Sequence, residues 1–193
     1  MTDPILRMDQ LSKRFGGVQA LKNVSFDVFP GDVLGIIGPN GSGKTTIVNS
    51  ITGFIKPTSG KVFFKGHDIT GKPPHKIADM GVTRTFQVMR PYYSLPAYKN
   101  LVIPLFSPRA KRTGGWGGGG RLGNRQTIAL DILEDIGFER DSYIPFKKTS
   151  TLPTGYLKRL ELARCLALKP EIIICDEVFS GLSMSEIASM VPL

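Results

Sequence analysis

The N-terminal part of the chain alternates apolar and polar residues in a way that predicts a strand. In residues 23–29, NVSFDVF, the side chains of Val24, Phe26 and Val28 share one face. This two-residue period is typical of a half-buried strand. The Pro-Gly pair at 30–31 then predicts a turn.

Three further segments extend the pattern. VLGII at 33–37 is a short, continuous apolar run, which favours a central strand of a parallel sheet. A helix is predicted from Lys44 to Thr52, and KVFFKG at 61–66 resembles a strand between two glycines. Strands and helices in this order predict an α/β fold.

The C-terminal half predicts one long helix and one more strand. QTIALDILEDIG at 126–137 spaces its isoleucines four residues apart, which makes one apolar helix stripe that ends at Gly137. The apolar residues 172–175 predict a strand buried on both faces. Two acids, Asp176 and Glu177, follow this strand directly.

The stretch between Arg109 and Arg125, RAKRTGGWGGGGRLGNR, is mostly glycine and basic residues. Glycine at this density cannot offset its ordering entropy, so we expect a mobile surface loop. Contact of this basic loop with nucleic acid or lipid headgroups is the alternative, and the linker is the favoured interpretation.

Composition places the chain among globular proteins without a membrane span. No apolar run approaches the ~18 residues of a transmembrane helix, and the N-terminal MTDPILRMDQ lacks a signal peptide's charge and apolar core. Cys165 and Cys175 lie in apolar segments without partner ligands, so we expect buried free thiols. These features predict a cytoplasmic protein. The net charge of +9 is scattered, and a solvated basic surface explains it at least as well as a nucleic-acid groove.

GPNGSGKTT at 38–46 lies between the strand predicted at 33–37 and the helix predicted after it. It matches G-x-x-x-x-G-K-[ST], whose glycines let successive backbone N–H groups turn inward around phosphate. The helix start adds its positive dipole end. Lys44 would supply a charge to the β- and γ-phosphates, and the Thr45 hydroxyl can bind Mg²⁺. The predicted nucleotide site comprises Gly38, Pro39, Asn40, Gly41, Ser42, Gly43, Lys44, Thr45 and Thr46.

The two acids after the strand at 172–175 fit the same interpretation. In a P-loop NTPase, a second buried strand brings a carboxylate to the Mg²⁺ ion. Asp176 is then expected to reach the metal through water, and Glu177 to orient and polarise the attacking water. Without the phosphate loop, two acids at a strand end would more often be a solvated turn.

The whole set of motifs resembles the ATP-binding subunit of ABC transporters, above all the type that serves branched-chain amino acid importers. The resemblance covers nearly the whole chain and is carried by KRFGGVQAL, GPNGSGKTT, ITGFIKPTSGKV, GVTRTFQ, LKRLELARCLALKP and IIICDE. It implies one ABC ATPase domain: a nucleotide-binding core with an antiparallel β edge at 1–90 and 169–193, and a helical subdomain at 91–168.

The resemblance also implies roles for single residues. Phe15 would stack on adenine with Val18 nearby, and Gln87 would sense Mg²⁺ and the attacking water. The family signature loop, usually LSGGQ, acts in the opposite subunit of a dimer. Its counterpart here is Leu152, Pro153, Thr154, Gly155 and Tyr156.

The sequence departs from the family pattern at several places. Pro153 has neither a hydroxyl nor an N–H, so we expect weaker contacts to phosphate across the dimer, with the dipole of the helix that follows LPTGY still available. Val178 stands where proline is usual and Ser183 where aspartate or asparagine is usual. The histidines, His67 and His75, both precede the acidic strand, so neither matches the family's histidine that contacts γ-phosphate. The domain is therefore expected to be incomplete at its C-terminus.

The leading interpretation is an ATPase that binds ATP and Mg²⁺, pairs with an identical or sister subunit, and drives membrane permease subunits at the inner face of the cell membrane. Import of hydrophobic amino acids, indirectly with a substrate-binding protein, is the expected task, although lipopolysaccharide export uses a similar ATPase. No nucleic acid partner is expected. The alternatives are a soluble ABC-type ATPase acting on nucleic acid or ribosomes, and a non-hydrolysing nucleotide-binding fragment.

Overall fold

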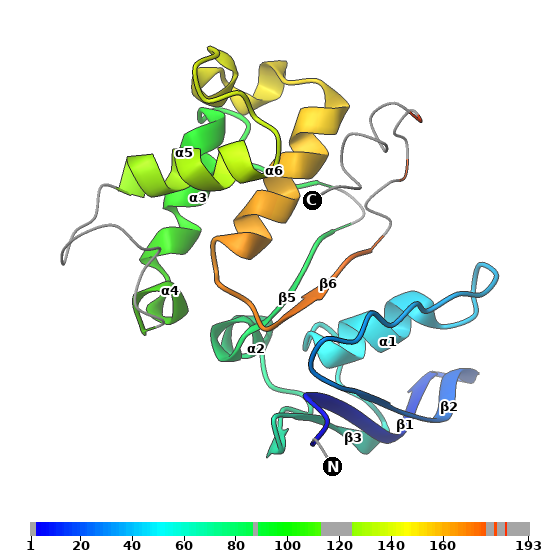
Figure 1. Ribbon diagram of the computed structural model, residues 1–193. Coiled ribbons are helices and arrows are strands. Elements are labelled where there is room, and N and C mark those ends of the chain that lie inside the picture. Colours follow the sequence, from blue (N-terminus) through cyan, green and yellow to red (C-terminus); the bar gives the residue numbers. More distant parts are fainter. Residues whose placement is uncertain (1–2, 87–88, 113–124, 177–179, 181–183, 185–193) are drawn as a thin grey trace. The chain divides into compact units, whose positions relative to one another are not determined.

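The computed structural model describes residues 3–86, 89–112 and 125–176, together with residues 180 and 184 (Figure 1). The chain divides into two compact units, Met1–Ile77 and Ala78–Leu193. Each unit has its own buried side chains and its own β-sheet.

The first unit contains an antiparallel four-stranded sheet in the order β2-β1-β3-β4 (Figure 1). Its strands are β1 (Leu6–Phe15), β2 (Val18–Val28), β3 (Ser59–Phe64) and β4 (His67–Asp68). The strands predicted at 23–29 and 61–66 are confirmed for residues 23–28, which belong to β2, and residues 61–64, which belong to β3. The predicted turn is confirmed as well, since the Asp32 N–H donates to the Phe29 carbonyl at 3.1 Å.

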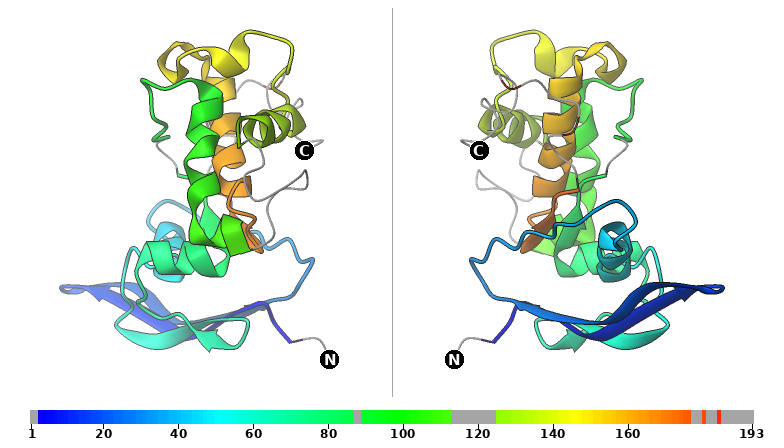
Figure 2. Two further views of the ribbon diagram at one scale, coloured as in Figure 1. Left: turned by 90° about the vertical axis from the view of Figure 1, so that its left-hand side faces the viewer. Right: turned by 90° about the vertical axis from the view of Figure 1, so that its right-hand side faces the viewer.

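Helix α1 (Lys44–Ile51) lies on one face of this sheet (Figure 2). The core of the unit is formed where the apolar side of α1 meets the sheet. Its buried residues are Leu6, Met8, Leu11, Leu21, Ile47, Val48, Ile51, Val62 and Phe64. The helix predicted from Lys44 to Thr52 is therefore confirmed to within one residue.

The central strand predicted at 33–37 is not confirmed. The segment belongs to no strand of either sheet, and Val33 and Ile37 are 100% and 94% exposed. A strand buried on both faces needs hydrogen-bonded neighbours and a covering layer, and no described strand pairs with these residues. The apolar run predicts the capacity for burial, but burial also requires a partner strand.

The second unit pairs β5 (Val82–Arg84) with β6 (Ile172–Ile174) in parallel. Residues of β6 are half-buried, so the expectation of a strand covered on both faces was wrong for this segment. Cys175, which follows β6, is exposed, whereas Cys165 is buried. Only one of the two expected buried thiols is therefore confirmed.

Helices dominate the rest of this unit, and α3 (Ala97–Val102), α5 (Arg125–Asp135) and α6 (Thr154–Leu166) share one core. The isoleucine stripe predicted at 126–137 is confirmed, because Ile132, Leu133 and Ile136 are buried in that core. Gly137 ends the helix with φ of 82°, and the Phe138 N–H returns to the Leu133 carbonyl at 2.9 Å. The remaining helices are α2 (Pro74–Met80), α4 (Pro108–Arg112) and the 3₁₀ turns Pro104–Phe106, Ile144–Phe146 and Thr149–Thr151.

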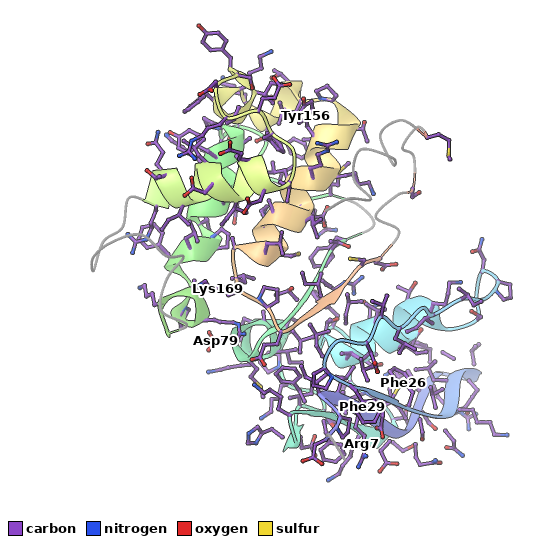
Figure 3. All side chains as sticks on the ribbon, viewed as in Figure 1. Arg7, Phe26, Phe29, Asp79, Tyr156 and Lys169 are labelled. Carbon is purple, nitrogen blue, oxygen red and sulfur yellow. The ribbon has the colours of Figure 1, made fainter. Side chains whose placement is uncertain are left out.

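The glycine-rich stretch at 109–125 begins within a helix rather than a loop. Residues 109–112 belong to helix α4, and Arg109 is 7% exposed, so the prediction of a mobile loop starting at Arg109 was wrong there. Its guanidinium donates to the carbonyls of Lys169 and Met80 at 2.7–2.9 Å. Lys169 is labelled in Figure 3. Residues 113–124 lie outside the described part of the chain.

Candidate nucleotide-binding site

The phosphate loop leads directly into α1, as the sequence predicted. Gly43 precedes the helix as its N-cap residue, and no side chain caps the helix start. The N–H groups of a helix's first turn have no intrahelical partner, so they remain donors for an anion. The helix start is thus the electropositive end that phosphate binding requires.

Glycine is required at two positions of this loop. Gly41 and Gly43 have φ of 81° and 96°, a backbone region that L-residues with side chains rarely adopt. A Cβ on Gly43 would also lie 2.8 Å from the Ala20 carbonyl oxygen. These constraints explain why the loop keeps glycine where its backbone turns most sharply.

Lys44 extends back over the loop that precedes it. Its ammonium donates to the carbonyls of Gly38 and Pro39 at 2.7 and 2.9 Å. An ammonium carries three N–H donors, so it can hold the loop and still offer a donor to phosphate. The predicted loop residues therefore lie together, and Lys44 is positioned by the loop's own carbonyl groups.

The residues expected to contact adenine lie at a hairpin of the first unit. Phe15 and Val18 are register partners at the end of β1 and the start of β2. Phe15 is 47% exposed and Val18 68% exposed, and the Lys13 ammonium lies 4.9 Å from the centre of the Phe15 ring. An exposed aromatic face of this kind can stack on a planar base.

In the second unit, Asp176 lies at the carboxyl end of β6, as predicted. Its N–H donates to the Thr85 hydroxyl at 3.0 Å, and the Thr85 N–H donates to the Ile174 carbonyl at the same distance. The Asp176 side chain is 19% exposed. The β5–β6 ladder therefore fixes the backbone of this acid and leaves its carboxylate accessible.

The carboxylate of Asp176 is paired with an arginine that the sequence reasoning did not single out. The Arg84 Nη2 donates to Asp176 Oδ2 at 2.8 Å, and the Arg84 side chain is only 8% exposed. Burial lowers the pKa of Arg84 and the nearby Asp176 charge opposes that change. The signal was present in GVTRTFQ, because a charged residue at the end of an apolar strand needs a buried partner.

A second missed residue, Glu161, connects the same strand end to α6. Its carboxylate accepts a hydrogen bond from the Phe86 N–H, and the residue is 7% exposed. Burial raises the pKa of Glu161, against the opposing effect of the Phe86 N–H. Gln87 and Glu177, the predicted water-handling pair, both lie outside the described residues.

The signature residues form the start of a helix rather than a loop. Helix α6 begins at Thr154, with Pro153 at its N-cap, three residues before the start expected at Leu157. Leu152 and Gly155 are buried, and the Tyr156 ring packs edge-on against Phe138 at 5.0 Å (Figure 3). The first-turn N–H groups of α6 are therefore those of the signature residues themselves.

Thr45 in the first unit and Asp176 in the second each carry a group whose chemistry fits Mg²⁺. The metal prefers hard oxygen ligands such as carboxylates and hydroxyls. Thr45 offers an exposed hydroxyl at the start of α1, and Asp176 offers an accessible carboxylate at the end of β6. Bound with nucleotide at these residues, Mg²⁺ would supply positive charge that offsets the negative charge developing on the phosphates.

The family described as "ABC transporter" matches residues 21–180 of this chain. The chain belongs to the ABC transporter family. It is an ATPase subunit of that family, and the predicted P-loop ATPase fold is confirmed by solved members.

Two kinds of relatives support this assignment. The chain is 37% identical over 96% of its length to the high-affinity branched-chain amino acid transport ATP-binding protein LivG of Escherichia coli (strain K12), and it covers 74% of that protein. The ADP conformation of MJ1267, an ATP-binding cassette of an ABC transporter, matches with a TM-score of 0.81 and 34% identity, over 99% of this chain and 75% of that one. A dimeric post-hydrolysis state of the cassette MJ0796, bound to ADP and Pi, matches with a TM-score of 0.78 and 26% identity. That match covers 97% of this chain and 80% of the other.

No helix in the described part of this ABC ATPase is long and apolar enough to cross a membrane.

Proposed function

We propose that this ABC ATPase energises a membrane importer of branched-chain, hydrophobic amino acids. The phosphate loop carries the ATPase part of the proposal, because its αL glycines and Lys44 are arranged around an uncapped helix start. The similarity to LivG supports the choice of substrate. The protein acts at the inner face of the cell membrane, with permease subunits and, indirectly, a substrate-binding protein.

In this proposal each residue of the site has its own chemical role. Lys44 and the loop N–H groups hold the β- and γ-phosphates, and Phe15 stacks on adenine with Val18 beside it. Thr45 and Asp176 supply oxygen ligands to Mg²⁺, with Gln87 as a further metal contact. Glu177 orients the attacking water.

The protein works as a pair of ATP-binding subunits. Residues 152–156 of each subunit face the γ-phosphate held by the other, through the first-turn N–H groups of α6. Pro153 contributes no donor to that contact. The segment 91–168 docks a permease loop. Its described regular elements are the α-helices α3, α4, α5 and α6 and three 3₁₀ turns.

Phosphate release in permease-containing liposomes tests the proposal. With Mg-ATP supplied on the side of the membrane that carries the ATPase, uptake of leucine should require ATP. Glu177→Gln should lower phosphate release by about a hundredfold or more, because a water-positioning group is lost. Binding of Mg-ATP should persist in this variant, which separates hydrolysis from binding. Equal, Glu177-independent rates would contradict the assigned role. ATP-driven uptake of a different solute class, with none of leucine, would contradict the substrate.

A further inference from the structure

The Arg84–Asp176 ion pair is more buried than the pairs Arg109–Glu171 and Arg7–Asp27. The Arg109 and Glu171 side chains are 9% and 33% exposed. The Arg84 and Asp176 side chains are 8% and 19% exposed, whereas Arg7 and Asp27, paired at the same 2.8 Å, are 51% and 33% exposed. A buried guanidinium has lost much of its hydration, so its bond to the carboxylate is a substantial interaction. Arg84 and Asp176 therefore stabilise each other in a way that an exposed pair does not.

Most contacts that hold the backbone around Arg84 do not use its guanidinium, although the Arg84 Nε also donates to the Thr85 carbonyl at 3.2 Å. Strand β5 pairs with β6, the Phe86 N–H donates to Glu161, and the Cys165 thiol donates to the Arg84 carbonyl at 3.1 Å. Replacement of the Arg84 side chain is thus expected to leave the strand end in place. The side chain can change partner without moving the strand that presents it.

We propose that Arg84 competes with Mg²⁺ for the carboxylate of Asp176. The inference rests on the proposed function, in which Asp176 is a metal ligand, and adds a residue that sets how tightly the metal binds. A guanidinium and a divalent cation are both attracted to the same carboxylate, and each weakens the attraction of the other. Arg84 is therefore a positioning residue that keeps Asp176 neutralised and lowers its affinity for Mg²⁺.

The competition has a direction and an approximate size. An opposite charge at hydrogen-bond distance typically weakens the attraction of a carboxylate for a second cation by about tenfold or more. The same electrostatic effect acts on a metal ion, so removal of the Arg84 charge should tighten Mg²⁺ binding by about tenfold. Without Mg²⁺, the same change should lower the unfolding temperature, because Asp176 loses its counter-ion.

The test measures the unfolding temperature of the full chain at fixed ATP while Mg²⁺ is varied, for the wild type, Arg84→Gln and Arg7→Gln. The Mg²⁺ concentration that gives half of the maximal rise in unfolding temperature should fall about tenfold in Arg84→Gln. This midpoint should stay unchanged in Arg7→Gln, whose ion pair is exposed and lies on the sheet of the first unit. Arg84→Lys, which keeps the charge, should shift the midpoint less than Arg84→Gln. Arg84→Met, which also lacks the charge, serves if Arg84→Gln does not fold. In an Asp176→Asn background, the Arg84 substitutions should no longer change the midpoint.

An unchanged or higher Mg²⁺ midpoint in the Arg84 variant that lacks the charge overturns the competition. If the wild type shows a Mg²⁺-dependent shift that Asp176→Asn removes, while the Arg84 variants behave as wild type, the metal role of Asp176 stands and only this inference fails. If ATP stabilises the wild type equally with and without Mg²⁺, the assignment of Asp176 as a metal ligand and the inference fail together.

Discussion

At the scale of single residues, burial decides the chemistry of groups that look equivalent in the sequence. Cys165 and Cys175 both lie in apolar segments, yet one is buried on α6 and the other is exposed after β6. Burial raises the pKa of the Cys165 thiol to about 12, so almost no thiolate is present at neutral pH. The apolar pattern cannot make this distinction, because it does not say where a strand end meets solvent.

We expect the two thiols to react at different rates. In the native protein, a thiol-reactive aromatic disulfide should modify Cys175 well before Cys165. The reaction needs both solvent access to the sulfur and the thiolate form. In denaturant the two rates should become similar. Peptide mapping after partial labelling measures this, and faster native labelling of Cys165 would show that α6 does not cover it.

Glu161 should make stability depend on pH. Burial raises its pKa above the ordinary 4.5, so the folded protein binds the proton more tightly than the unfolded chain does. Its contribution to stability is therefore fully present below pH 4.5 and is lost as pH rises through the folded pKa. Glu161→Gln keeps an oxygen for the Phe86 N–H but cannot ionise.

The unfolding free energy of Glu161→Gln relative to wild type should accordingly increase from pH 4.5 toward neutral pH and then level off. Chemical denaturation at a series of pH values measures this difference. A flat difference across the range would mean that the charged form of Glu161 is compensated by its neighbours, among them Arg84, Lys158 and Arg164.

At the scale of elements, periodicity predicted what local pattern can determine. Periodicity within a segment was enough to predict four elements, and these are confirmed: most of the strands at 23–29 and 61–66, helix α1 and the apolar stripe of α5. The strand at 33–37 failed, because a buried strand also depends on a neighbour distant in sequence. Helix α4 was missed because its short sequence, PRAKR, has no apolar face and is positioned instead by the hydrogen bonds of Arg109.

Arg109→Ala should therefore destabilise the protein well beyond an ordinary surface change. It leaves the carbonyls of Lys169 and Met80 without this donor in a largely buried place, which typically costs about 1–3 kcal/mol for each unsatisfied group. We expect a loss of about 2–4 kcal/mol in the free energy of unfolding. Lys111→Ala, at an exposed position of the same helix, is the matched control and should change stability by less than about 0.5 kcal/mol. Equal effects of the two substitutions would contradict the anchoring role of Arg109.

At the scale of the whole molecule, the proposed nucleotide chemistry is divided between two compact units. The phosphate loop and the adenine contacts belong to the first unit, and Asp176 with the signature residues belongs to the second. The phosphate loop and the acid after β6 were predicted from motifs that combine a local turn or strand end with one chemical group. The adenine contacts and the signature residues were implied by the family resemblance. The partners of those groups, such as Arg84 for Asp176, lie 92 residues apart in the chain and became visible only in the structure.

The binding of Mg-ATP to the whole chain tests the central claim most directly. Isothermal titration calorimetry should show one nucleotide per chain for the wild type. Lys44→Ala should weaken binding by roughly 1.5–3 kcal/mol, because a charge-assisted phosphate contact is lost, while its unfolding temperature without ATP stays close to that of the wild type. Equal affinities of the wild type and Lys44→Ala would contradict the assignment of this loop as the phosphate site.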